Sequence, residues 1–145
     1  MVIRPARPED VTQLAELAAE LGYPVSASEA TDYLARIVPS VDHAVLVAEA
    51  EGGQVVGWIH GFVARRVFVP EFAELGGLVV SGPNRRSGVA SQLLAGVEEW
   101  ATQVGCSVIR IRSNSQRIEA DAFYRRSGYI AAKTQTVFEK RLQRR

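Results

Sequence analysis

The alternation of apolar and polar residues is clearest between residues 74 and 104. Residues 74–80 are mainly apolar and end on β-branched side chains, which is typical of a buried strand. After a short polar loop, apolar residues recur with the helical period of 3.6, which predicts a helix over 88–104 with one buried face. Gly105 then provides a suitable helix end. This strand, loop and helix form the unit around which we place the other elements.

The segments before this unit predict two helices and a strand hairpin. The expected elements are a strand over 2–6, a helix from Pro8 to Leu21, a helix capped by Ser26 or Ser28 that ends at Ile37, and strands over 43–50 and 55–67. Residues 51–54 form the hairpin turn, and residues 69–72 link the hairpin to strand 74–80. Gly57 and Gly61, inside the second strand, predict bulges or a close approach of another backbone.

The segments after this unit complete an α/β chain. They predict a strand over 107–112, a helix over about 117–127 that ends at Gly128, and a strand-like stretch over 129–142. Because a helix separates strand 74–80 from strand 107–112, the two strands should be parallel. We therefore expect a mixed sheet.

The loop after strand 74–80 has the composition of a phosphate-binding turn, with Gly82, Pro83, Arg85, Arg86 and Gly88. A glycine-rich turn at a helix start points backbone N–H groups outward, and the helix dipole adds positive charge there. The loop has neither the Gly-Lys-Ser/Thr of a P-loop nor the Gly-x-Gly-x-x-Gly of a dinucleotide fold. The alternative is a plain turn whose glycines serve geometry alone.

Composition narrows the class of protein. The chain has 145 residues, 47% of them hydrophobic, which suits one globular domain over 1–145. It has no apolar run of about 18 residues and no signal-like start, so we expect no membrane partner and a cytoplasmic location. Its single cysteine, Cys106, allows no internal disulfide and has no histidine motif beside it.

Charge is distributed unevenly although the net charge is only +1. Residues 1–80 carry eleven acidic groups against five arginines, whereas residues 110–145 carry ten basic groups against three acidic ones. One half should attract cations and the other anions, although most such charges are ordinary solvated surface. There is no basic stripe with interleaved aromatics, so we expect no nucleic-acid partner, and no ligand spacing for a metal.

Two motifs carry a resemblance to a known family. Arg85-x-x-Gly88-x-Ala90, directly after residues 78–80, resembles the acyl-coenzyme-A pyrophosphate loop of the GNAT superfamily of N-acetyltransferases. Downstream of Ser113-Asn114, the segment Ala120-x-x-Phe123-Tyr124-x-x-x-Gly128-Tyr129 resembles that family's second conserved segment. The match is nearest to the amine- and aminoglycoside-type branch, which often has histidine where this chain has Asp121.

The resemblance implies a single-domain GNAT fold of the α/β class across the whole chain. Its mixed central sheet would have a V-shaped split between the strands near 74–80 and 107–112, with about four helices around it. Gly76 and Gly77 would allow the bulge that this strand has in the family. The implied reaction moves an acetyl group from acetyl-coenzyme A to a primary amine, by direct attack in a ternary complex.

The uneven charge makes a cationic acceptor the expected one, either a small amine or a protein amine. A homodimer, with the last strand as the contact, stays open. A non-catalytic acyl-coenzyme-A sensor on the same fold is the alternative function.

The resemblance also assigns roles to residues. The coenzyme contacts would be Leu78, Val79, Val80, Arg85, Arg86, Ser87, Gly88, Val89, Ala90 and Ser91, together with Asn114 and Tyr124. Tyr124 is the candidate acid for the departing thiolate, and Glu74 the candidate base, with Glu71 as a weaker substitute.

Each assignment has a structural alternative. Tyr124 could be a half-buried aromatic beside a core Phe123, Glu74 a surface carboxylate at a strand end, and Asn114 a helix cap. His43 and His60 are more often packing or surface residues than catalysts, although His60 on the hairpin could face the substrate.

Overall fold

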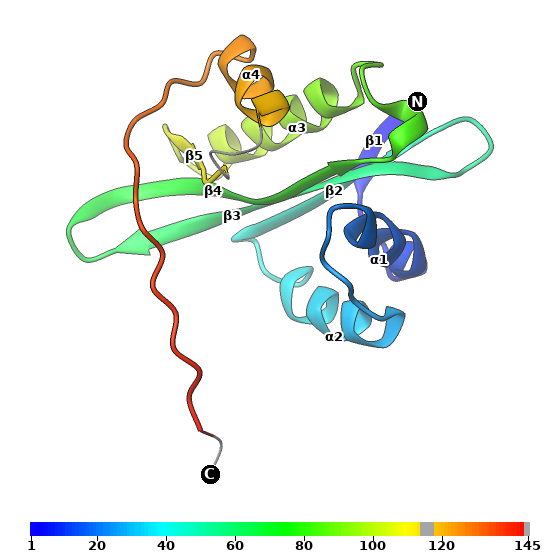
Figure 1. The fold of residues 1–145 in the computed structure, drawn as a ribbon, viewed down its shortest axis with the longest axis horizontal. Coiled ribbons are helices and arrows are strands. Elements are labelled where there is room, and N and C mark those ends of the chain that lie inside the picture. Colours follow the sequence, from blue (N-terminus) through cyan, green and yellow to red (C-terminus); the bar gives the residue numbers. More distant parts are fainter. Residues whose placement is uncertain (114–117, 144–145) are drawn as a thin grey trace. The chain divides into compact units, whose positions relative to one another are not determined.

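The computed structural model describes residues 1–113 and 118–143 and divides into two compact units, Met1–Arg112 and Ser113–Arg145. The first unit contains β1 (Val2–Pro5), a 3-10 turn (Pro8–Asp10), α1 (Val11–Glu20), α2 (Ala27–Ile37), β2 (His43–Glu49), β3 (Val55–Arg66), β4 (Val69–Val80), a second 3-10 turn (Gly82–Asn84), α3 (Val89–Gln103) and β5 (Ile109–Ile111) (Figure 1). The second contains α4 (Ile118–Arg126).

The first unit is a five-stranded sheet covered by helices on both faces (Figure 1). The strands follow the order β1-β2-β3-β4-β5; all neighbours are antiparallel except β4 and β5, which are parallel. The parallel pairing confirms the expectation that a helix joins these two strands. α3 covers one face, and α1 and α2 lie on the other. Ser26 caps α2 as predicted, since its side chain accepts a hydrogen bond from the Glu29 N–H.

Glycines in β3 bring α3 close to the sheet. A Cβ on Gly57 would lie 3.2 Å from side-chain carbons of Val89 and Leu93, and one on Gly61 would lie 2.9 Å from Val97 Cγ1. The predicted backbone approach is confirmed at Gly57, where the Val79 carbonyl oxygen would lie 3.0 Å from a Cβ. At Gly61 the close neighbours are side chains, and it is the β3–β4 register that shifts there. Because side chains alternate along a strand, Trp58, His60 and Phe62 must lie on the opposite face. The largest fully buried side chains are Val47, Ile59, Leu93, Leu94 and Val97.

β4 carries a bulge at the point where it leaves β5. In the β3–β4 register His60 faces Gly77 and Gly61 faces Leu75, so Gly76 is the extra residue. β5 pairs with Ala73–Leu75 of β4, and its register with β4 stops there. The edge of β4 over residues 76–80 is then open toward β5; we call this opening the sheet split. The predicted bulge and V-shaped split are confirmed.

Two strand boundaries differ from those expected. β4 begins at Val69, so residues 69–72 are not a link: Val69 pairs with Arg66 and Phe72 with Ala64. The reason is packing of Phe72, which is buried, with the guanidinium carbons of Arg66 and Arg110 at 5.4 and 4.4 Å from its ring centroid. β5 covers Ile109–Ile111, shorter than the predicted 107–112.

A buried ion-pair cluster ties β1 to the start of α1 and to β2. Arg4 donates two hydrogen bonds to the Asp10 carboxylate at 2.8 and 2.9 Å, and its Nε donates to Glu49 Oε2 at 2.8 Å. The Arg7 N–H donates to Asp10 Oδ2 at 2.7 Å. The Arg4 guanidinium therefore holds the pKa of Asp10 below its usual value. The sequence placed Asp10 only as an acid in a first helical turn.

The predicted strand over 129–142 is wrong for the single chain. Residues 129–143 belong to no strand, and their apolar side chains are exposed: Ile130 by 86%, Val137 by 83%, Phe138 by 92% and Leu142 by 83%. A strand pattern in the sequence becomes a strand only when a neighbouring edge accepts its backbone hydrogen bonds. In the described residues, no helix is long and apolar enough to cross a membrane.

Candidate functional site

The loop before α3 presents backbone donors at the helix start. Gly88, the residue that precedes α3, has φ 86° and Arg86 has φ 63°, so both lie in the left-handed region. The first helical hydrogen bond runs from the Gln92 N–H to the Gly88 carbonyl oxygen at 3.1 Å. The N–H groups of residues 89–91 consequently have no acceptor within the helix, and they lie at its positive dipole end.

Side chains fix this loop to the end of β4. Arg85 Nε donates to the Val80 carbonyl oxygen at 3.2 Å, Asn84 Nδ2 donates to Ser81 Oγ at 2.8 Å, and Ser87 Oγ donates to the Asn84 carbonyl oxygen. A Cβ on Gly88 would meet no heavy atom within 4 Å, so the space in front of the helix start is open. The loop therefore fits a pyrophosphate group.

The split continues from this loop along β4. Leu78, Val79 and Val80 pair with β3 on one edge of the strand, and their other edge lies beyond the last β4–β5 pair. In the described part of the chain no β5 residue pairs with this second edge, although the Val80 carbonyl oxygen already accepts from Arg85 Nε. The three residues adjoin the loop, so the predicted backbone contacts form one continuous line.

The two candidate carboxylates lie in different surroundings. Glu74 is in register with Phe62 on β3 and Arg110 on β5, two residues before the bulge; its side chain is 13% exposed and accepts from Arg112 Nε at 3.0 Å. Glu71 is half exposed and lies 3.4 Å from Arg65 Nη2. Only Glu74 is both sheltered and close to the split. Because Phe62 faces away from α3, Glu74 shares that face.

The two histidines form a pair that the sequence did not predict. His43 Nδ1 lies 2.9 Å from His60 Nε2, and the rings stack with centroids 5.2 Å apart. The Phe62 ring packs against both, at 5.9 Å and 5.8 Å. Burial, with a contribution from nearby His43, lowers the pKa of His60 to about 4. The signal that the sequence analysis lacks is the β2–β3 register. It places His43 opposite Phe62 and His60 opposite Val45, so the two histidines are diagonal neighbours on the same face of the hairpin.

The second unit contains the candidate acid. Tyr124 on α4 is half-buried, and its ring packs against Phe123 at 5.3 Å and Tyr129 at 6.1 Å. Phe123, expected in the core, is only half-buried. Asn114 lies outside the described residues. The catalytic role of Tyr124 stays a prediction.

Other reactive groups are accounted for. Cys106 is buried, and burial raises the pKa of its thiol. Among the described residues, no three His, Cys, Asp or Glu side chains gather in a way that could hold a metal ion.

The sequence model of the acetyltransferase (GNAT) family matches residues 10–129 of this chain. An aminoalkylphosphonate N-acetyltransferase from Salmonella typhimurium is 37% identical over 78 residues, which are 53% of this chain and 51% of that protein. The chain thus spans about half the length of this relative. An aminoglycoside N(6')-acetyltransferase type 1 from Stenotrophomonas maltophilia is 30% identical over 132 residues, which are 88% of this chain and 84% of that protein.

Solved structures share the fold over nearly the whole chain. The apo aminoglycoside antibiotic 6'-N-acetyltransferase AAC(6')-IG from Acinetobacter haemolyticus has a TM-score of 0.85 at 22% identity, covering 99% of this chain and 100% of that one. The aminoglycoside N-acetyltransferase AAC(6')-Iy, in a structure with coenzyme A, has a TM-score of 0.83 at 19% identity, covering 97% and 100% of the two chains.

Replacing Gly88 with glutamate tests the loop. We expect Gly88→Glu to lower the affinity for acetyl-coenzyme A by at least about 100-fold, or about 2.7 kcal/mol, because a side chain and a negative charge enter the phosphate path. Gly105→Glu is the matched control, since Gly105 also has a positive φ (92°) with no heavy atom within 4 Å of its Cβ position. Isothermal titration that finds wild-type affinity in a folded Gly88→Glu protein removes this loop from the site.

Proposed function

Because the chain belongs to the acetyltransferase (GNAT) family, we propose that it transfers the acetyl group of acetyl-coenzyme A to a cationic primary amine. The transfer is direct attack within a ternary complex. The observation that supports this proposal most is the position of Glu74, a sheltered carboxylate two residues before the bulge at which the sheet opens. Both curated relatives are named as N-acetyltransferases of amino compounds, an aminoalkylphosphonate and an aminoglycoside.

The coenzyme would occupy the loop and the sheet split. The N–H groups of residues 85–91 would hold the pyrophosphate, with the Arg85 and Arg86 side chains adding positive charge nearby. Backbone groups of residues 78–80 would hydrogen-bond the pantetheine arm, and an N–H around Val79 or Val80 would polarise the thioester carbonyl. The contacts assigned to Asn114 and Tyr124 complete this proposed coenzyme site.

The acetyl transfer itself needs three chemical tasks. A neutral amine must attack the carbonyl carbon, the oxyanion must be stabilised, and the departing thiolate must receive a proton. Tyr124 is the proposed donor of that proton. The C–N bond forms as the C–S bond breaks, and the acceptor ammonium releases one proton overall to solvent.

Glu74 is the proposed anchor for the acceptor. Its carboxylate can attract an ammonium group to the face of the sheet opposite α3, next to the expected position of the thioester. We propose a cationic primary amine rather than an aminoglycoside in particular, because Asp121 replaces the histidine frequent in the aminoglycoside-type branch.

A panel of amines tests the acceptor class. We expect thiol release from acetyl-coenzyme A with polyamines or other cationic amines, and much less with neutral or acidic amines. Glu74→Gln should lower kcat/KM for the best cation by about 10-fold or more, whereas Glu51→Gln at the exposed β2–β3 turn should not. Equal turnover of acidic amines together with full activity of Glu74→Gln would contradict the proposal. Turnover of any amine excludes a purely coenzyme-binding sensor.

Removing the Tyr124 hydroxyl tests the proposed acid. Tyr124→Phe should keep the fold and the coenzyme affinity but lower kcat by roughly 10²-fold, the low end for a positioned acid. Tyr129→Phe, which removes the same group from the neighbouring ring, is the control. If kcat stays within about twofold of wild type with chemistry rate-limiting, Tyr124 has a packing role and water supplies the proton.

The exposed tail supports a homodimer. Residues 129–143 carry exposed apolar side chains in a strand-like pattern, and within the described residues β5 pairs with β4 on one edge alone. An edge strand offers unpaired backbone groups to another strand. We therefore propose that the tail of a second copy pairs along β5, and that each copy gives and receives one strand.

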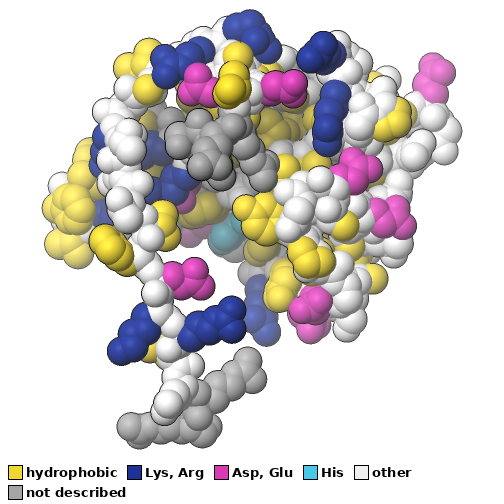
Figure 2. Space-filling model, in the orientation of Figure 1, with side chains coloured by type: hydrophobic (Ala, Val, Ile, Leu, Met, Phe, Trp, Pro, Cys, Tyr) yellow, Lys and Arg dark blue, Asp and Glu magenta, His cyan; other side chains and the backbone are white. Residues whose placement is uncertain are grey.

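A charge placed in the tail tests this assembly. Phe138→Asp should convert a dimer to a monomer in analytical ultracentrifugation, because an aspartate would disfavour strand pairing and burial there. Phe68→Asp is the matched control: Phe68 is 82% exposed, at the β3–β4 turn where Figure 2 shows apolar side chains at the left end of the molecule. A monomeric wild-type protein, or a dimer unaffected by Phe138→Asp, overturns the assembly.

A further inference from the structure

The His60 ring lies directly over the bulge in β4. A Cβ on Gly76 would be 2.8 Å from His60 Nδ1 and 3.4 Å from its Cε1 and Cγ, so any side chain at residue 76 would displace the ring. Gly76 is also the first β4 residue beyond the described β4–β5 register, whose last pair is Leu75 with Ile111. The Nδ1 edge of His60 is therefore held at the apex of the sheet split, on the face that also bears Glu74.

The other ring nitrogen of His60 points to a second imidazole. His60 Nε2 and His43 Nδ1 are 2.9 Å apart, so one of them donates a proton to the other. If His60 donates, its Nδ1 is left as a free acceptor at the split. The pair can hold one added proton but not two. With two, His43 Nδ1 and His60 Nε2 would both be protonated and their N–H groups would point at each other.

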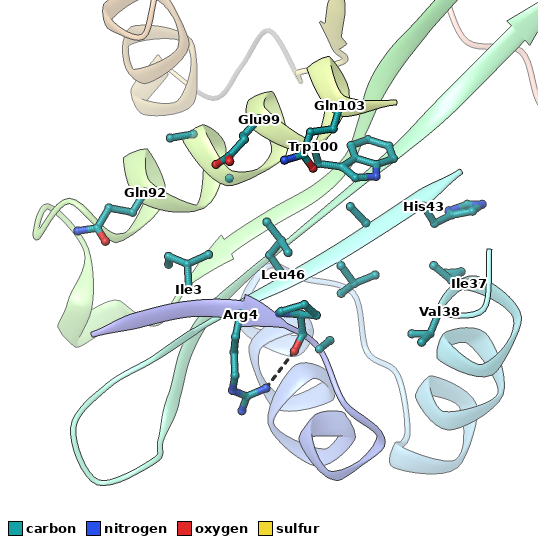
Figure 3. A pocket seen from close by; sticks show the side chains of 16 residues that line it. Ile3, Arg4, Ile37, Val38, His43, Leu46, Gln92, Glu99, Trp100 and Gln103 are labelled. Carbon is teal, nitrogen blue, oxygen red and sulfur yellow. Dashed lines mark hydrogen bonds between the residues drawn. The ribbon is translucent and has the colours of Figure 1, made fainter. Parts of the chain in front are cut away.

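His43 connects the pair to a groove at the far side of β2. The groove has a volume of about 680 Å³ and is lined by His43, by Ile37 and Val38 at the end of α2, and by Trp100 and Gln103 of α3 (Figure 3). His43 is only half-buried, so its ring nitrogen that does not face His60 can exchange a proton with solvent. Figure 2 shows histidine atoms at the bottom of a hollow, next to apolar side chains.

The charged groups around the pair are engaged with one another. Glu74 is bonded to Arg112, Asp42 to Arg65, and the Arg110 guanidinium lies over Phe72. Phe62 covers both rings from β3. Within the part of the chain that the structure describes, neither histidine is hydrogen-bonded to a carboxylate, so the proton of the pair can move without breaking an ion pair.

We propose that the His60–His43 pair is the proton relay of the transferase, with His60 Nδ1 as the acceptor of the amine proton. This inference rests on the proposed function. The bound ammonium gives one proton to His60 Nδ1 while the Nε2 proton of His60 passes to His43 Nδ1, and His43 releases a proton to solvent. The neutral amine then forms the C–N bond to the acetyl carbon. After the C–S bond breaks, the second proton lost by the nitrogen balances the one gained by the thiolate.

The burial of His60 is consistent with a residue that passes a proton on and does not retain it. With its pKa lowered to about 4, His60 is neutral at pH 7 and keeps an unprotonated ring nitrogen. A proton that arrives at Nδ1 is therefore passed on to His43 rather than retained. Glu74 contributes the negative charge that brings the ammonium group to the split, and the histidines take its proton.

The resting tautomer gives a test that needs no turnover. Long-range ¹H–¹⁵N spectra of the whole protein at pH 7.5 should show His60 protonated at Nε2 and unprotonated at Nδ1, with His43 accepting at Nδ1. Protonation of His60 at Nδ1 would overturn the relay. The tautomer can be measured without knowing the acceptor amine. A wrong tautomer therefore contradicts the relay alone, whereas inactivity toward all amines contradicts the proposed function.

Kinetics across pH give the second test. His60→Gln keeps a donor for His43 but cannot relay a proton, and at pH 7 it should lower kcat/KM for the best cationic amine by on the order of 10²-fold. His43→Gln should have a smaller defect, and Glu51→Gln serves as the control. The His60→Gln defect should shrink as pH approaches the pKa of the free amine, because a neutral amine needs no base. A defect that is constant from pH 6.5 to 9.5, or no defect, overturns the relay.

Discussion

The bulge at Gly76 is the constraint on which the rest of the site depends. One extra residue in β4 shifts its register with β3 and coincides with the end of its pairing with β5. The strand therefore keeps one edge bonded and opens the other, beside the start of α3 where backbone N–H groups gather. The same missing side chain makes room for the His60 ring. The bulge at one glycine thus shapes the sheet split and makes room for the His60 ring.

Much of this arrangement could be predicted from local sequence. The βα unit over 74–104 has strong periodicity, so its helix and the end of its strand agree closely with the observed bounds, although β4 begins earlier, at Val69. Gly57 predicts a bulge or a close backbone approach, and the Val79 carbonyl oxygen does lie close to it; the packing of Val89, Leu93 and Val97 on β3 was not predicted. Adjacent glycines in a central strand signalled the bulge. These features depend on residues near one another in the chain. Hydrophobic periodicity and the backbone freedom of glycine are therefore enough to predict them.

What was missed depends on pairing between distant residues. The His43–His60 hydrogen bond and the Arg4–Asp10–Glu49 cluster join segments whose register a single sequence does not fix. β4 includes Phe72, whose ring is covered by two arginines from the neighbouring strands. The strand propensity of single residues does not encode such contacts. In the tail, the apolar pattern predicts a strand over 129–142, but residues 129–143 form none, because among the described residues no strand pairs with them. Tertiary context decided each of these cases.

The glycines of β3 and β4 have a consequence for how this sequence can vary. At positions 57 and 61 the space of a side chain is occupied from α3, and at positions 76 and 77 it is occupied from β3 by His60 and Trp58. Each glycine therefore leaves space that the side chain packed against it fills. A larger residue at one of the two positions requires a smaller residue at the other. A natural variant with alanine at 61 would need a smaller residue at 97, and one with a side chain at 76 would have to give up the ring at 60. Covariation between these pairs, rather than invariance of either member, is the trace that this packing should leave among related sequences.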